Sequence, residues 1–122
     1  MRISLVTVTR NRKWAIPIMF KNWLAAGKYV DEWIILDDGV ENLSLFFNND
    51  KKIKYTQLSQ NDIRNAIGEI ETGGDAKDWI SYHKLFNRIP IGKKRNMACQ
   101  LATGDIIVHV DDDDLYFEEY FK

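Results

Sequence analysis

The sequence has a single cysteine, almost no net charge and no long hydrophobic run, and each scarcity excludes a class of protein. One cysteine, Cys99, rules out a disulfide within the chain and slightly favours a reducing compartment. No stretch approaches the roughly 20 apolar residues that a membrane-spanning helix needs. Residues 1–6 are too short for a signal peptide and lack its small-residue cleavage site. We therefore expect a cytoplasmic protein with no transmembrane segment.

The charge balance argues against polyanionic partners. The chain has 17 basic and 18 acidic residues, so its net charge is −1, and we expect no binding to nucleic acid. The two histidines, His83 and His109, are not spaced as metal ligands. At 122 residues and 45% hydrophobic content, the composition is that of one globular domain spanning residues 1–122.

Apolar runs and helical spacings alternate along the chain. Strands are predicted for residues 3–9, 32–36, 52–58 and 105–110, and helices for residues 14–26 and 92–103. Residues 40–50 predict a loose helix or loop. Residues 59–90 have weak signals, interrupted by glycines, and are interpreted as a variable insert or mobile loop with a helical stretch over 78–87.

This order predicts an α/β fold with an open, mainly parallel Rossmann-like sheet of about four strands, flanked by helices. In such a sheet the carboxyl ends of all strands lie on one edge, where ligands bind. The polar residues that follow the strands are therefore the candidate functional residues.

Four consecutive aspartates follow the last predicted strand, at residues 111–114. Like charges at this spacing raise one another's pKa values, and a divalent cation is the usual remedy. Carboxylates suit Mg²⁺ or Mn²⁺, which also bind diphosphates. Alternate side chains of an extended backbone share a direction, so Asp111 and Asp113 are the candidate metal ligands. A solvated acidic loop is the alternative.

Two further groups are expected on the same rim. Asp37 and Asp38 end the second strand, where a carboxylate can accept hydrogen bonds from a nucleobase or a ribose, although such triplets with glycine also form ordinary turns. Residues 92–96 open a helix with three cations, which favours a diphosphate, with a solvated basic turn as the alternative. Arg10 and Arg12 are a second source of positive charge.

Together these motifs resemble the inverting family 2 glycosyltransferases of the GT-A fold, and specifically their donor-binding N-terminal half. The resemblance is carried by four segments in the family's order: ISLVTVTRNR at 3–12, IILDDG at 34–39, GKKRNMA at 92–98 and GDIIVHVDDDD at 104–114. Each segment alone is only moderately specific, and the four in order are a strong signal.

The resemblance implies roles for individual residues. Asp37 or Asp38 would bind the base, with Thr9 and Arg12 nearby, and Arg95 would approach the diphosphate or the base. Asp111 and Asp112 would contact the donor, and Asp111 and Asp113 would hold Mn²⁺ or Mg²⁺.

The resemblance also implies an activity, the inverting transfer of a sugar from a UDP- or GDP-sugar to a hydroxyl of a glycan or other acceptor. In the family, the half after the Asp-x-Asp motif binds the acceptor and supplies a carboxylate general base. No residue in this sequence matches that base, so the catalytic base is left unassigned and the acceptor-binding half is expected to be missing.

Other functions remain as alternatives. A non-catalytic nucleotide or nucleotide-sugar binding module, or an inactive fragment, would have the same rim without a base. An aspartyl-phosphate phosphotransfer domain would need partner Lys and Thr or Ser residues on later strands. A nucleotidyltransferase would need a glycine-rich phosphate loop after the first strand, where residues 9–12 contain no glycine.

A sheet of about four strands without a covering half is expected to expose apolar area and an edge. The aromatic residues of the tail are candidates for that surface: Tyr116, Phe117, Tyr120 and Phe121. We therefore predict self-association, as a homodimer that covers it.

Overall fold

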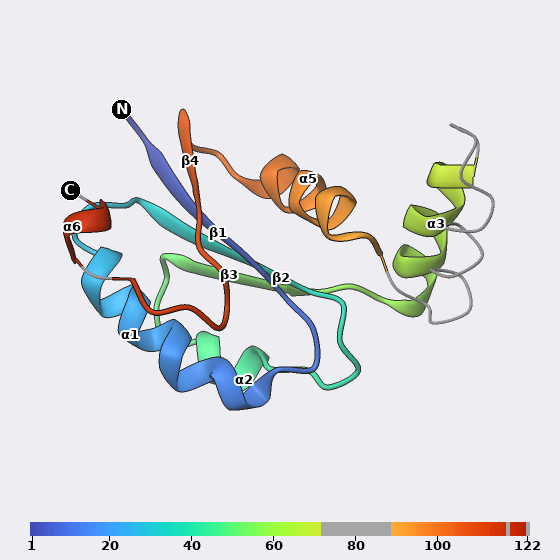
Figure 1. The fold of residues 1–122 in the computed structure, drawn as a ribbon, viewed down its shortest axis with the longest axis horizontal. Coiled ribbons are helices and arrows are strands. Elements are labelled where there is room, and N and C mark those ends of the chain that lie inside the picture. Colours follow the sequence, from blue (N-terminus) through green and yellow to red (C-terminus); the bar gives the residue numbers. More distant parts are fainter. Residues whose placement is uncertain (72–88, 117, 122) are drawn as a thin grey trace.

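A computed structural model describes residues 1–71, 89–116 and 118–121 (Figure 1). Its strands are β1 (Ile3–Thr9), β2 (Glu32–Asp37), β3 (Ile53–Gln57) and β4 (Ile106–His109). A short 3-10 turn, η1 (Lys13–Ala15), precedes the helices α1 (Ile16–Ala26), α2 (Ser44–Phe47), α3 (Gln60–Glu71), α5 (Ile91–Leu101) and α6 (Glu118–Phe121). No helix among these residues is long and apolar enough to cross a membrane.

The strands form one four-stranded, all-parallel sheet in the order β3-β2-β1-β4. This confirms the predicted open α/β architecture and is consistent with a Rossmann-like fold. Every residue of β2 is buried, as expected for a central strand covered on both faces. The register places Thr9 beside Asp37, so the chain leaves β1 and β2 at the same level of the carboxyl rim.

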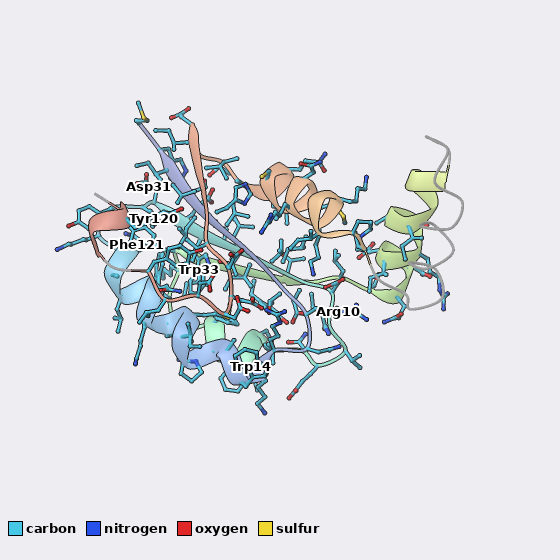
Figure 2. All side chains as sticks on the ribbon, in the orientation of Figure 1. Arg10, Trp14, Asp31, Trp33, Tyr120 and Phe121 are labelled. Carbon is cyan, nitrogen blue, oxygen red and sulfur yellow. The ribbon has the colours of Figure 1, made fainter. Side chains whose placement is uncertain are left out.

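One face of the sheet packs against α1 and α2 (Figure 1). Its centre is Trp33, which is 1% exposed and stacks on Trp23 with ring centroids 5.3 Å apart. The buried indole N–H of Trp33 donates to Thr7 Oγ1 at 3.0 Å, so its polar atom is satisfied. Figure 2 shows Trp33 between the sheet and α1, away from Arg10 at the carboxyl rim.

The other face packs against α5. Val6, Ile34 and Leu36 point to this side and surround Ala98, which is fully buried. Lys94 lies one turn before Ala98 on the same face of α5, because residues four apart on a helix are neighbours. The packing of Ala98 therefore directs Lys94 toward the carboxyl ends of the strands.

The first part of the predicted insert is the helix α3, so the interpretation of these residues as a loop was wrong. Ser59 and Asp62 cap each other's backbone amides at the start of α3, both at 3.1 Å. Ile63, Ala66 and Ile67 form its buried face with Ile89. The capping pair and this helical spacing were readable in the sequence and outweigh Gly68 within the helix. The helical stretch predicted for residues 78–87 lies outside the described residues.

The buried carboxylate of Glu32 lies at the amino ends of the strands. Glu32 Oε2 accepts hydrogen bonds from the Ser4 hydroxyl and from Thr103, whose amide and hydroxyl lie at 2.6 and 2.9 Å. The Gly104 amide donates to Ser4 Oγ at 2.8 Å, so close that a Cβ at this glycine would collide with Ser4. This network joins β1, β2 and the segment that enters β4.

The tail after the aspartates returns across α1. The buried side chain of Asn22 donates to the Asp114 carbonyl and accepts from the Tyr116 amide, both at 2.7 Å. Tyr116 and Phe121 pack against the core, Tyr120 is 52% exposed, and Phe117 lies outside the described residues. Among the described strands β4 lies at the edge of the sheet, and its Ile106 and Ile107 are 41% and 38% exposed.

Candidate functional site

A cavity of about 430 Å³ opens where the carboxyl ends of β1 and β4 meet the amino end of α5. Its volume falls in the range of small-molecule and cofactor sites. The lining combines four basic residues, three aspartates and an apolar wall: Arg10, Arg12, Lys94 and Arg95; Asp111, Asp112 and Asp113; Val8, Ile89, Pro90 and Ile91.

The aspartates alternate in direction, as the sequence predicted. The side chains of Asp111 and Asp113 are 44% and 42% exposed, whereas that of Asp112 is 6% exposed. Asp112 turns inward and accepts hydrogen bonds from Thr9 Oγ1 at 2.7 Å and Arg12 Nη1 at 2.9 Å. Thr9 is buried and holds the end of β1 against the aspartates, and it does not line the cavity.

The two outward aspartates are each paired with an arginine of the cavity. Arg95 Nη2 lies 3.1 Å from Asp111 Oδ1, and Arg12 Nη1 lies 3.1 Å from Asp113 Oδ2. A hydrogen bond with Asp111, together with the neighbouring carboxylates, raises the pKa of Asp114. The acidic run is thus crowded with negative charge, and a cation would relieve that crowding.

The aspartates offer oxygen ligands for the predicted divalent ion. Within the described ranges, no three His, Cys, Asp or Glu side chains are arranged to hold a metal. Mg²⁺, however, is commonly bound through one or two carboxylates, with phosphate oxygens and waters as the other ligands. The partly exposed oxygens of Asp111 and Asp113 fit an ion that shares its coordination with a bound phosphate.

Asp37 and Asp38 point away from each other, although they are adjacent. Asp37 turns into the protein, where its Oδ1 accepts from the Gly39 amide at 2.7 Å and its Oδ2 accepts from the Tyr55 hydroxyl. Burial raises the pKa of Asp37 despite these hydrogen bonds. Its oxygens hold the turn after β2, and it does not line the cavity.

Asp38 is buried behind the cavity wall, with its side chain 0% exposed. Lys94 Nζ lies 2.7 Å from Asp38 Oδ1, and Arg10 Nη1 lies 3.3 Å from Oδ2 and 3.0 Å from the Asp38 carbonyl. The loop after β1 approaches closely here, since a Cβ on Gly39 would lie 2.6 Å from the Asn11 amide nitrogen. Asn11 has a φ of 51°, which asparagine tolerates better than most residues.

The predicted site residues therefore occupy two positions. Arg12, Arg95, Asp111, Asp112 and Asp113 lie at the cavity, whereas Thr9, Asp37 and Asp38 are buried and do not line it. The sequence interpretation noted the positive charge of Arg10 and Lys94 but assigned neither to the site. It also missed the apolar wall at Ile89 to Ile91, where the apolar residues just before the helical cations were the available signal.

The amino end of α5 forms this wall. Pro90 is its N-cap residue and provides no side-chain hydrogen bond, and the first turn contains no acidic residue. The partial positive charge of a helix amino end therefore adds to the charge of Lys94 and Arg95 at the cavity. The site thus brings acidic and basic side chains together.

Comparisons with known proteins give a similarity of fold. No protein-family model matches the sequence, and no curated protein matches it. Among solved structures, the chain is similar to the crystal structure of S. aureus TarS 1-349, with a TM-score of 0.58 and 23% sequence identity. The match covers 98% of this chain and 30% of the TarS chain. The chain therefore has the fold of part of TarS and spans less than a third of its length.

Proposed function

We propose that the chain is a glycosyltransferase-type domain that binds a nucleotide-diphosphate sugar together with Mn²⁺ or Mg²⁺, for inverting transfer of the sugar to an acceptor hydroxyl. The observation that carries this proposal is the meeting of Asp111 and Asp113 with Arg12, Arg95 and the amino end of α5 around one cavity. Such a cavity offers ligands for a divalent cation beside groups that bind phosphate.

The similarity of fold supports the coarser part of the proposal. TarS is a family 2-like glycosyltransferase of the GT-A type, and its fold is shared over nearly the whole of this chain. The four sequence segments that resemble the GT-A family lie on β1, on β2, at the start of α5 and on β4 with the aspartates. Three of these segments contribute residues to the cavity lining.

The roles proposed for the chain's own residues follow from their positions. Asp111 and Asp113 would orient the donor through the ion, which supplies Lewis-acid stabilisation of the departing nucleotide diphosphate. Arg95 and Arg12 would contact the phosphates once the ion binds the aspartates. Asp112 fixes Arg12 and Thr9, so it would act on the donor by positioning these neighbours. The general base remains unassigned.

Calorimetric titration of UDP, and then of GDP, with and without Mn²⁺ tests this function directly. Binding of one nucleotide that requires the metal would support the donor site and identify the base. If neither nucleotide binds a folded sample in the presence of Mn²⁺, the proposal fails.

Donor hydrolysis separates an enzyme from a binding module. Slow, Mn²⁺-dependent release of UDP or GDP from the matching nucleotide sugar would favour the glycosyltransferase. Metal-dependent nucleotide binding without any release of nucleotide would favour the non-catalytic binding module.

A further inference from the structure

A buried cluster of one carboxylate and two cations lies beside the cavity. Asp38 is in contact with Lys94 at 2.7 Å and with Arg10 at 3.3 Å. The Asp38 side chain is 0% exposed, that of Lys94 is 9% exposed, and that of Arg10 is 22% exposed. The acid therefore lies deepest, and both cations line the cavity in front of it.

Asp38 contacts two cations rather than one, and both of them line the cavity. The adjacent carboxylate of Asp37 also attracts Lys94, but it does not line the cavity. An ammonium has three N–H donors, and a hydrogen bond to Asp38 leaves others for a bound anion.

The aspartates outnumber the arginines that pair with them. Asp111, Asp112 and Asp113 are paired with Arg12 and Arg95, and Asp114 is hydrogen-bonded to Asp111. The cavity lining therefore combines these acidic groups with Lys94 and Arg10, which pair with Asp38 instead. A ligand that carries both a divalent cation and phosphate groups matches this pattern, with the cation on the aspartates and the phosphates toward Lys94.

We infer that Lys94 and Arg10 bind the diphosphate of the donor, and that Asp38 is a positioning residue that holds these two cations in place. The inference rests on the proposed function and deepens it. It also assigns Asp38 a role other than the base contact implied by the family resemblance. The reason is geometric, because the Asp38 carboxylate lies behind the cations and does not line the cavity.

Inorganic pyrophosphate is the probe, because it carries the phosphates without a base or a sugar. Calorimetric titration with Mn²⁺ should show that Lys94→Met lowers pyrophosphate affinity at least about ten-fold, the loss of a charge-assisted contact. Lys94→Arg, which keeps the charge, should retain most of the affinity. Lys54→Met, on the exposed part of β3, is the matched control. Unchanged affinity in Lys94→Met, or no binding by the wild-type chain, would overturn the inference.

Asp38→Asn tests the positioning role. If Asp38 acts through the cations, this variant should change the affinities for pyrophosphate and for UDP by the same factor. If Asp38 instead contacts the base, nucleotide affinity should fall while pyrophosphate affinity is unchanged, which would overturn the positioning role.

The unmutated chain provides a measurement that does not depend on variant folding. Pyrophosphate should shift the ¹⁵N resonance of the Lys94 ammonium more than that of Lys54, and equal shifts would overturn the inference.

The outcome of these experiments can be separated from that of the proposed function. Lys94-dependent pyrophosphate binding with no added affinity for UDP or GDP would support the role of Lys94 and contradict the nucleotide-sugar function. Nucleotide binding that is unchanged in Lys94→Met would support the nucleotide-sugar function and contradict the role of Lys94.

Discussion

The Thr9 hydroxyl donates a hydrogen bond of 2.7 Å to Asp112 Oδ2 and so ties the end of β1 to the aspartates that follow β4. The two residues are 103 positions apart in the sequence, and both are buried. Because Asp112 is held inward in this way, Asp111 and Asp113 are turned toward the cavity. The orientation of the candidate ligands thus depends on Thr9, which does not itself line the cavity.

The first prediction concerns this hydrogen bond. Thr9→Val should lower the free energy of unfolding by about 1–3 kcal/mol, because it leaves an oxygen of a buried carboxylate without its donor. Thr9→Ser keeps the hydroxyl and should cost less. Urea denaturation at pH 7 measures both, and equal unfolding midpoints for the two variants would show that the hydrogen bond contributes nothing.

The second prediction concerns the outward aspartates. Asp111→Asn and Asp113→Asn should each abolish the Mn²⁺-dependent part of UDP or GDP binding, because an amide is a weaker ligand for a hard cation than a carboxylate. Both positions are about half exposed, so the free energy of unfolding should change little. Calorimetric titration measures the binding.

The control for these variants is Asp105→Asn. Asp105 lies at the other end of β4 and accepts a hydrogen bond from the Arg2 amide. The control variant should bind nucleotide and metal as the wild type does. Intact metal-dependent nucleotide binding in Asp113→Asn would remove this residue from the metal site.

The third prediction is a pH dependence that arises at Glu32. Burial acts to raise the pKa of Glu32, but hydrogen bonds from Ser4 and Thr103 and the charge of Arg2 outweigh it and hold the pKa below its usual 4.5. A lowered pKa means that the unfolded state binds the proton more readily. The stabilisation is therefore complete above pH 4.5 and is lost as the pH falls through the lower, folded-state value.

Glu32→Gln should thus be less stable than the wild type at pH 7, by about 1–3 kcal/mol for the weakened hydrogen bonds. The difference between the two proteins should shrink as the pH falls below 4.5. Urea midpoints measure this difference from about pH 7 down to about pH 3, a range that spans the usual carboxyl pKa values. Glu41→Gln, at an exposed position, is the control. A difference that is constant across this range would contradict the assigned cause.

The sheet was predictable because its strands are marked in the sequence. Val6, Ile34 and Ile35 belong to short β-branched runs, and the helical spacing between those runs indicates parallel connections. The start of α3 was missed because the glycine at 68 received more weight than the capping pair Ser59 and Asp62, although a glycine within a helix costs only about 1 kcal/mol.

The candidate site was predictable only as a location. The carboxyl rim follows from the topology, so Arg12, Arg95 and Asp111 were expected near one another and lie at one cavity. Which way each side chain points depends on contacts between residues far apart in sequence. Asp38 and Lys94 are 56 positions apart, and no local pattern indicates that one is buried behind the other.

The last prediction concerns the edge of the sheet. In the part of the chain that the structure describes, β4 is a terminal strand of the sheet, and Ile106 and Ile107 are partly exposed on it. An exposed apolar edge is a template for pairing with another chain, so we expect the protein to form a homodimer as its concentration rises.

Ile107→Lys should shift this equilibrium to the monomer, because a charge on an edge strand opposes pairing. Leu24→Lys, at an 83% exposed position on α1, should not. Light scattering over a concentration series measures the mass, and a wild-type chain that stays monomeric at high concentration would refute the dimer.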